Sequence, residues 1–304
     1  MTEPEIKKVQ EFLKIPKTGL YDEFTEAAVR NFQIKNRLKV TGLIDNETLQ
    51  LVDSESNLGL ISTDLTETNL AIKKHFLKPD EYYKGPTKKR AIFLHFTAGS
   101  SNPINVVDGW ERDERGKVGT HYVIGGINLF TNSTEFDGDI VQCMPDYGNY
   151  AWHLGIGNTA LHRESIGIEL CSYGPIKFKN GSFWTWNDKK VPTLETEKRV
   201  GRLAEPFRGY EFYHKISHAQ LKSLYFLIKK LAQDNQIDLV GGLKEFLKIQ
   251  TPNQAFDYQP KVHLGEIKSG LFTHCHVSPK NKYGNYEKWD MFPQPELIDM
   301  INSL

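Results

Sequence analysis

Two histidines stand where short apolar runs end, in segments that lie far apart in the chain. His95 follows the apolar run Ala91–Leu94, and His274 lies just before a turn in THCHVSPK. A fold can bring such residues together, and neutral imidazoles are common ligands of zinc, which favours nitrogen, sulfur and carboxylate donors in a tetrahedron. The first hypothesis is therefore a metal-assisted hydrolase. The alternative is that each histidine is an ordinary core or surface side chain.

Composition and charge narrow the class of protein. The 304 residues suggest about two domains, and 39% hydrophobic with 25% charged residues is an ordinary globular balance. Lys and Arg number 38 and so do Asp and Glu, so no bulk charge would attract nucleic acid or an anionic membrane. No segment resembles a signal peptide or a membrane span. We expect synthesis in the cytoplasm, no nucleic-acid partner and no membrane span.

The cysteines do not suggest a disulfide framework. Cys143, Cys171 and Cys275 are an odd set without a Cys-x-x-Cys pair, which fits a reducing compartment. We expect them to be small buried apolar side chains.

The first fifty residues read as a small helical unit. Thr2 and Glu5 have capping-box spacing, and an apolar stripe at helical period predicts a first helix that ends near Lys14. The turn pattern TGLYD at residues 18–22 recurs twenty-three residues later as TGLID at 41–45, each followed by a threonine. Two copies of one turn motif therefore organise this unit.

This unit resembles the peptidoglycan-binding domain of three short helices found at the ends of many cell-wall hydrolases. The resemblance rests on the repeated turn and on the pairs Val9-Gln10, Ala28-Val29 and Phe32-Gln33. It implies a domain over residues 1–52 whose partner is bacterial peptidoglycan. The alternative is a helical cap that only packs on its neighbour. Residues 53–68 are polar and are interpreted as a linker, which leaves 69–304 as the larger domain.

The larger region alternates strand-like and helical patterns. Strands are predicted over 90–96, 121–125 and 165–171, and the clearest helix is predicted over 217–234, opened by Ser217 and Gln220 at capping-box spacing. We expect an α/β domain with a mixed central sheet flanked by helices, preceded by the small three-helix domain.

Five motifs of this region occur in the order found in the type 2 N-acetylmuramoyl-L-alanine amidases. They are FLHFTAG at 93–99, THYVI at 120–124, AWHLG at 151–155, SIGIEL at 165–170 and His274 with VSP at 277–279. The resemblance implies zinc-dependent hydrolysis of the amide between N-acetylmuramic acid and L-alanine in the cell wall. Joined to a wall-binding domain, it looks like a phage endolysin, a monomer released through a holin; a bacterial wall-recycling enzyme or an exported effector is the alternative.

The resemblance also implies the ligands of one zinc ion per chain. His95 and His274 match the family's two imidazoles, and Asp290 matches its third ligand, although it comes about six residues later than usual, after the extra stretch 281–286. Such a site leaves a fourth position for water, whose pKa zinc lowers to about 7. Cys275 is the rival third ligand; neighbours on an extended strand point to opposite faces, which disfavours it.

Catalytic and substrate-binding roles follow from the same resemblance. Glu169 matches the family's general base, which takes a proton from the water and returns one to the leaving nitrogen. Lys288 would stabilise the oxyanion. Trp152 and His153 are expected to form a wall of the substrate groove, and His121 to be a substrate-binding or packed residue beside them. Residue 120, a tyrosine in some phage members, is threonine here.

The segment 173–215 departs from shorter family members. Asn180-Gly181 between two apolar runs predicts a β-hairpin. Its aromatic residues Phe183, Trp184 and Trp186 either form a lip beside the site or cover the helix that follows.

Two other functions remain open from the sequence. A member that lost a ligand would recognise peptidoglycan without cutting it, and a zinc peptidase would cut within the stem peptide by similar chemistry. Released fragments distinguish them, since only an amidase frees stem peptides that begin with L-alanine.

Overall fold

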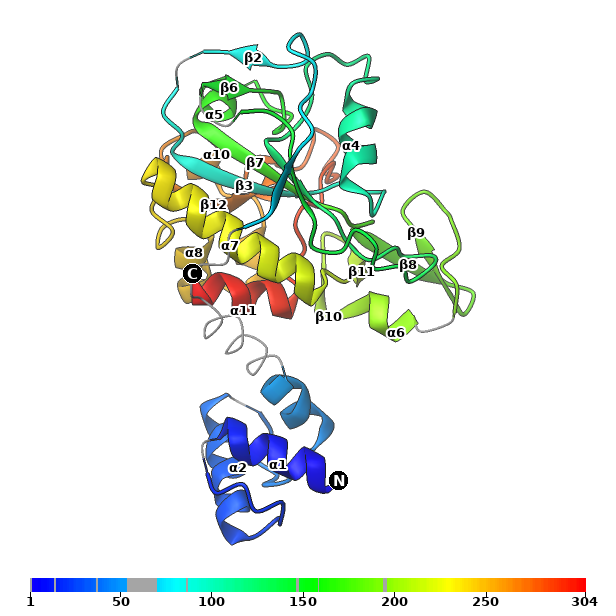
Figure 1. Ribbon diagram of the computed structural model, residues 1–304, viewed down its shortest axis with the longest axis vertical. Helices are drawn as coiled ribbons and strands as arrows, with labels where there is room; N and C mark the ends of the chain where they lie inside the picture. The colour runs from blue at the N-terminus through cyan, green and yellow to red at the C-terminus, as the bar shows by residue number, and fades with distance from the viewer. Residues whose placement is uncertain are drawn as a thin grey trace. The chain divides into compact units, whose positions relative to one another are not determined.

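The computed structural model describes residues 2–13, 15–36, 38–53, 70–85, 87–145, 148–157, 159–193 and 196–304. The chain forms two compact units, Met1–Thr68 and Asn69–Leu304 (Figure 1). All but the first residue of the predicted linker 53–68 lies outside the described residues. Each unit is described by itself.

The smaller unit consists of short helices around a small apolar core. Its helices are α1 (Glu3–Phe12), α2 (Glu23–Lys35) and the helical residues 46–53. The backbone N–H of Thr2 donates to the Glu5 carboxylate over 2.6 Å, as the predicted capping box requires. The buried apolar side chains are those of Ile6, Val9, Val29, Phe32, Ile44 and Val52.

A buried glutamine explains the first copy of the repeated turn. The Nε2 atom of Gln10 lies 3.0 Å from the Thr18 hydroxyl, 2.9 Å from the Leu20 carbonyl and 2.9 Å from the Thr25 hydroxyl. Its Oε1 accepts the backbone N–H of Gly19 over 2.8 Å. One amide therefore links helix α1, the turn and the start of helix α2.

The second copy repeats this arrangement atom for atom. Gln33 Nε2 lies 3.0 Å from the Thr41 hydroxyl, 3.0 Å from the Leu43 carbonyl and 2.9 Å from the Thr48 hydroxyl, and its Oε1 accepts from Gly42 N–H over 2.9 Å. Gly42 has a φ of 72°, a left-handed conformation that glycine adopts without strain. The sequence repeat is thus a repeat of buried hydrogen bonds.

A six-stranded mixed sheet forms the centre of the larger unit. Its order is β1-β5-β4-β7-β3-β12, and only the pairing of β4 with β5 is antiparallel. The strands are β1 (Ile72–Lys74), β3 (Ala91–Phe96), β4 (Tyr122–Ile124), β5 (Ile140–Gln142), β7 (Ser165–Leu170) and β12 (Gly270–Thr273). Three of these match the predicted strands, and the predicted α/β class with a mixed central sheet is confirmed.

Helices flank this sheet and cover its edges (Figure 1). The long helix α7 (His218–Asn235) begins at Ser217, whose hydroxyl accepts from Gln220 N–H over 3.0 Å. The other helices are α4 (Pro103–Trp110), α5 (Thr159–Glu164), α6 (Thr196–Arg199), α8 (Leu243–Ile249), α9 (Pro252–Phe256), α10 (Pro260–His263), the 3-10 helix η1 (His274–Val277) and α11 (Pro295–Ser303). Among the described residues, no helix combines the length and apolar character that a membrane span needs.

The segment 173–215 contributes all four strands of a second, antiparallel sheet. Its order is β10-β11-β8-β9, from β8 (Pro175–Lys179), β9 (Ser182–Thr185), β10 (Val200–Phe207) and β11 (Tyr210–His214). Asn180 and Gly181 have φ values of 52° and 69°, as expected of the tight turn predicted between β8 and β9. The remaining strands, β2 (Tyr83–Lys84) and β6 (Asn149–Tyr150), pair with each other.

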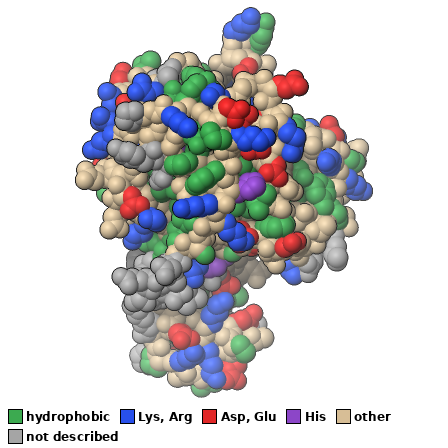
Figure 2. Space-filling view, turned by 45° about the horizontal axis from the view of Figure 1, so that its top comes forward, with side chains coloured by type: hydrophobic (Ala, Val, Ile, Leu, Met, Phe, Trp, Pro, Cys, Tyr) green, Lys and Arg blue, Asp and Glu red, His purple; other side chains and the backbone are tan. Residues whose placement is uncertain are grey.

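The protein surface carries both kinds of charge, and the three cysteines lie in the interior. On the face shown in Figure 2, basic and acidic side chains are mixed. Cys143, Cys171 and Cys275 are buried and form no disulfide with one another.

The glutamine arrangement yields a stability prediction. Replacing Gln33 by Leu leaves the buried Gly42 N–H without its acceptor, which costs about 1–3 kcal/mol. We expect faster amide hydrogen exchange across residues 15–53 of the full-length chain and unchanged exchange in strands β3 and β7. Gln50→Leu is the matched control because Gln50 is exposed on the helical residues 46–53. Equal exchange in the two variants would contradict the role given to Gln33.

Candidate metal centre and cleft

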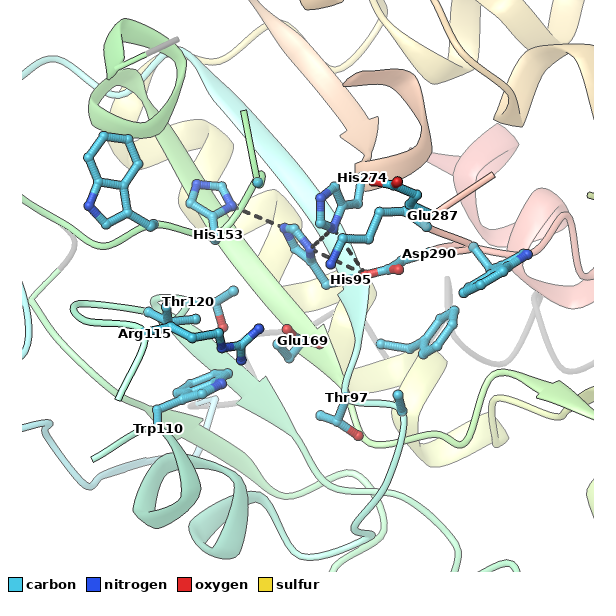
Figure 3. A pocket seen from close by; sticks show the side chains of 18 of the residues that line it. His95, Thr97, Trp110, Arg115, Thr120, His153, Glu169, His274, Glu287 and Asp290 are labelled. Atoms are coloured by element: carbon cyan, nitrogen blue, oxygen red, sulfur yellow. Dashed lines mark hydrogen bonds and ion pairs between the residues drawn. The ribbon is translucent and has the colours of Figure 1, made fainter. Parts of the chain in front are cut away.

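Three potential metal ligands converge at the carboxyl ends of parallel strands. His95 lies near the end of β3, His274 follows β12 directly, and Asp290 comes from the segment before α11. The Nδ1 atoms of the two histidines are 3.1 Å apart, and Asp290 Oδ2 lies 3.2 Å from His274 Nδ1 and 3.6 Å from His95 Nδ1 (Figure 3). Ligands bound to one zinc ion at about 2.0–2.1 Å in a tetrahedron are about 3.3 Å apart. The separations of the three atoms fit this geometry.

A chain of hydrogen bonds determines which nitrogen of His95 carries the proton. Ser165 Oγ donates to the Leu161 carbonyl over 2.5 Å, so it accepts from His153 Nε2 at 2.9 Å. The Nδ1 of a neutral His153 then accepts from His95 Nε2 over 3.1 Å. His95 Nδ1 consequently has a free lone pair, and this lone pair faces His274 and Asp290.

The second imidazole is oriented in the same sense. His274 Nε2 donates to the Leu154 carbonyl over 2.8 Å, which leaves the lone pair on Nδ1. Burial lowers the pKa of His95 to about 4, so the ring is neutral at physiological pH. Two imidazole lone pairs and a carboxylate oxygen therefore point at one position. Such an arrangement is repulsive without a cation and suits zinc or a similar ion.

His153 lies in the wall of the cleft and also belongs to this hydrogen-bond chain. It borders the cleft, but it is buried, and its two ring nitrogens hydrogen-bond to His95 and Ser165. A Cβ at Gly167 would lie 3.0 Å from His153 Nδ1 and 2.8 Å from Thr120 Cγ2. Glycine in the SIGIEL motif therefore leaves room for the ring that orients His95.

Glu169 lies beside the ligand cluster because of strand register. It pairs with His95 across β7 and β3, so both side chains project from the same face of the sheet. The residue is half-buried, but its Oε2 is enclosed and has no hydrogen-bond partner among the described residues. Burial, together with the nearby Asp290 carboxylate, raises the pKa of Glu169 well above its ordinary value, while Lys288 acts in the opposite direction. An enclosed carboxyl with a raised pKa beside a ligand cluster has the features of a group that exchanges protons.

A cleft of about 560 Å³ contains these groups. In Figure 3, Glu169 lies between the ligand cluster on one side and Trp110 and Arg115 on the other. The half-buried Lys288 also borders the cleft, and its Cε would be 3.9 Å from a Cβ at Gly155. The cleft therefore combines a ligand cluster, a carboxyl of raised pKa and a lysine.

Aromatic side chains form much of the remaining wall. Trp152 lines the cleft as predicted, and its Nε1 donates to the Tyr83 hydroxyl over 3.1 Å. Trp186 also lines it, and its Nε1 donates to the Ala98 carbonyl over 2.8 Å. Phe183 instead packs in a core with Ile176 and Val191. Trp186 therefore lies where the sequence predicted a lip, whereas Phe183 packs in the core of the second sheet rather than on a following helix.

Sequence reasoning did not identify Trp110 and Arg115 as part of the cleft. Arg115 is held by Asp113, which it contacts through Nε at 2.9 Å. Neither residue belongs to a motif with a recognisable spacing, and only the fold brings their loop to the site. From the sequence alone, a tryptophan at the end of a helix and an arginine in a charged loop cannot be recognised as residues of a cleft.

His121 does not reach the cleft. It is fully buried, its Nδ1 accepts from Gly167 N–H over 3.2 Å, and its Nε2 bonds to the Asn149 carbonyl over 3.1 Å. Both ring nitrogens are used by the backbone, so the packed role applies rather than substrate contact. Thr120 does border the cleft, and its hydroxyl donates to the Tyr122 carbonyl over 3.0 Å.

Cys275 lies outside the ligand cluster, for a reason other than strand alternation. His274 and Cys275 belong to the 3-10 helix η1, not to β12. The Cys275 sulfur faces the Lys288 carbonyl at 3.9 Å, and burial raises the pKa of its thiol well above the usual value. It is therefore a neutral buried thiol, and the Cys275 backbone N–H binds the Asp290 carbonyl over 2.7 Å.

Comparisons with known proteins agree with this architecture. The family model of the peptidoglycan binding domain matches residues 2–52, and that of N-acetylmuramoyl-L-alanine amidase matches residues 85–248. The second match includes His95 and Glu169 and ends before His274, Lys288 and Asp290. No curated protein matched the chain.

Several solved structures are similar to parts of the chain. A mutant endolysin from Bacillus subtilis is 18% identical, with 56% of this chain and 80% of that chain covered and a TM-score of 0.35. PlyL is 15% identical over 67% of this chain and 80% of its own, with a TM-score of 0.36. The catalytic domain of XlyA is 18% identical over 56% and 80%, with a TM-score of 0.34.

The amidase model covers more than half of the 304 residues, and the smaller unit matches a separate model. The chain therefore belongs to the N-acetylmuramoyl-L-alanine amidase family and carries an N-terminal peptidoglycan-binding domain.

Proposed function

We propose that the chain is a zinc-dependent amidase that cleaves the bond between N-acetylmuramic acid and L-alanine in peptidoglycan. The observation that carries the proposal is the convergence of three lone pairs, from His95 Nδ1, His274 Nδ1 and Asp290 Oδ2, beside the buried carboxyl of Glu169. Family membership indicates which bond the enzyme cleaves, the amide between N-acetylmuramic acid and L-alanine. The three ligand atoms indicate zinc, because many hydrolases bind zinc through two histidines and a carboxylate.

His95, His274 and Asp290 would hold the ion in the cleft. Bound zinc supplies a Lewis acid that polarises a carbonyl and lowers the pKa of water. The hydrogen bonds that His95 and His274 make through Nε2 direct their Nδ1 atoms toward the position that the ion would take. Asp290 would supply the third ligand atom through Oδ2, which faces both Nδ1 atoms.

Glu169 is the general base and acid of the proposed reaction. Its carboxylate takes a proton from the attacking water and then donates one to the nitrogen of the departing L-alanine. A raised pKa serves both steps, since the group has to be able to hold the proton between them. Its position opposite His95 in the strand register keeps it next to the ligand cluster.

Lys288 is proposed to stabilise the negative oxygen of the tetrahedral intermediate. It borders the same cleft as His274 and Glu169. Trp152 and Trp186 offer rigid aromatic surfaces for the sugar or the stem peptide. The bond cleaved is thereby held between a proton donor and a cationic side chain.

The smaller unit is proposed to hold the enzyme on its polymeric substrate. We propose domain boundaries at 1–52, 53–68 and 69–304, and the matched ranges 2–52 and 85–248 support the division into a smaller and a larger domain. A wall-binding domain joined to an amidase fits a monomeric lytic enzyme of the endolysin type. Tethering raises the local concentration of the catalytic domain at the wall.

Digestion of purified cell walls tests the reaction. Mass spectrometry of the soluble products should show stem peptides that begin with L-alanine and glycan strands that have lost them. Peptides cut inside the stem would indicate a zinc peptidase, and wall binding without any products would indicate a recognition protein.

Zinc content should depend on Asp290. We expect about one zinc per chain in the wild type and loss of most zinc, with loss of wall clearing, in Asp290→Ala, because removing one of three ligands leaves two imidazoles alone. Elemental analysis after dialysis measures the metal. Glu287→Gln is the matched control, since Glu287 is an acid that lines the same cleft outside the cluster. A zinc-loaded, active Asp290→Ala protein would show that the third ligand lies elsewhere.

Glu169→Gln should separate metal binding from chemistry. The amide cannot accept the proton, so kcat should fall by about 10²–10⁴-fold while zinc content stays at the wild-type level. Activity is measured as release of stem peptides, and zinc by the same elemental analysis. Wild-type activity in this variant would remove Glu169 from the mechanism.

The raised pKa of Glu169 also predicts a pH-dependent stability difference. In the metal-free protein the native state retains this proton above the pH at which the unfolded chain releases it. The wild type therefore loses stability relative to Glu169→Gln as pH rises above the unfolded pKa of about 4.3, by up to about 1.4 kcal/mol per pH unit. Urea unfolding at pH 4 and pH 7 measures the difference between the two proteins. A difference that does not change with pH would contradict a buried, protonated Glu169.

A further inference from the structure

An arginine at the tip of a hairpin adopts an unfavourable backbone conformation. Arg208 and Gly209 form the turn between the paired residues Phe207 and Tyr210 of β10 and β11, with φ values of 48° and 91°. A non-glycine residue at positive φ is costly and persists where its surroundings favour it. Arg208 belongs to the segment 173–215, so this feature lies in the part of the chain that departs from shorter family members.

The side chain of Arg208 is buried and its donors are used by backbone carbonyls. Only 1% of the side chain is exposed. Its Nη1 donates to the Lys288 carbonyl over 2.6 Å, and its Nη2 lies 3.1 Å from each of the carbonyls of Cys275 and Ser278. These carbonyls lie between two of the proposed metal ligands in sequence: those of Cys275 and Ser278 follow His274 by one and four residues, and that of Lys288 precedes Asp290 by two.

A carboxylate and an aromatic ring hold the guanidinium in this place. Asp257 Oδ1 accepts from Arg208 Nε at 2.9 Å and from Nη2 at 2.6 Å. The guanidinium carbon lies 4.4 Å from the centre of the Tyr286 ring, and the Tyr286 hydroxyl donates to Asp257 Oδ2 over 3.2 Å. Tyr286 belongs to the extra stretch 281–286, so the guanidinium contacts this stretch directly.

Arginine can bind several acceptors in fixed directions at once, whereas lysine cannot. Its planar fork presents five donors in fixed directions, whereas an ammonium is a point charge on a flexible stem. The contacts of Arg208 use this fork to join Asp257 with two stretches, 275–278 and 286–288. The two ends of the stretch between His274 and Asp290 therefore meet at one side chain.

We propose that Arg208 is a positioning residue that holds His274, Lys288 and Asp290 in their converging arrangement before the metal binds. This inference rests on the proposed function, since it concerns the same zinc site. Arg208 touches neither the cleft nor the ligand atoms and acts through the backbone carbonyls of Cys275, Ser278 and Lys288.

Metal affinity of the full-length protein tests the proposal. Zinc is titrated into the metal-free chain in competition with a chromophoric chelator, and cobalt(II) is titrated to record its visible absorption bands. We expect Arg208→Ala to bind zinc about 10–100-fold more weakly, as is usual when a group supporting metal ligands is removed. The cobalt bands should shift because the ligands are no longer fixed. Arg208→Lys keeps the charge beside Asp257 but loses the fork, and should restore only part of the affinity.

A matched control lies on the same strand. Arg202 of β10 is exposed and pairs with Glu211, so Arg202→Ala should bind zinc and cobalt like the wild type. Circular dichroism at the titration temperature shows whether each variant is folded. If Arg208→Ala does not fold, the zinc and cobalt titrations of Arg208→Lys test the proposal.

The outcomes that overturn the proposal are distinct. A folded Arg208→Lys or Arg208→Ala protein with wild-type zinc affinity and wild-type cobalt bands would show that Arg208 has only a structural role. A wild-type protein that binds no zinc would overturn the proposed metal site itself, and with it this inference.

Discussion

The site depends on the hydrogen-bond chain that fixes the proton positions of the two cluster histidines. Ser165, His153 and the Leu161 carbonyl leave His95 with its proton on Nε2, and the Leu154 carbonyl does the same for His274. With these tautomers, both Nδ1 lone pairs point toward Asp290. Reversing either ring would place an N–H where a metal ligand is needed. The fold therefore shapes the proposed cation site through groups that lie outside its three ligands.

The parallel strands supply the other half of the site. Strand register places Glu169 beside His95, and the ends of β3 and β12 place His95 near His274. Parallel strands end at one edge of a sheet, so residues distant in sequence meet there without long loops. The same arrangement encloses the Glu169 carboxyl and raises its pKa, so the position that suits the carboxyl for its proposed role also makes its ionised form unfavourable for stability.

The sequence predicted the elements better than the contacts between them. Alternation and capping signals located β3, β7 and α7, the Asn-Gly pair located the turn between β8 and β9, and the repeated TGL turn anticipated the paired glutamines of the small unit. The family motifs pointed to His95, His274, Asp290 and Glu169, and the first three now lie together. The roles of His153 and His121 could not be read from the sequence, because a histidine within a motif has the same signature whether it faces a substrate, another histidine or the backbone. Arg208 had no signal at all, since its partners are carbonyl groups of residues about 70–80 positions away.

The two segments for which the motif resemblance implied extra length meet in one contact. The stretch 281–286 lengthens the path from His274 to Asp290, and a longer path allows more conformations in which the ligands are apart. The hairpin of β10 and β11 brings a buried guanidinium to this path, where Tyr286 stacks on it and three carbonyls bind it. Fixing the path before binding reduces the ordering that the metal would otherwise have to impose. The hairpin thus offsets the conformational freedom that the longer stretch introduces, which gives a physical reason for both to occur in one chain.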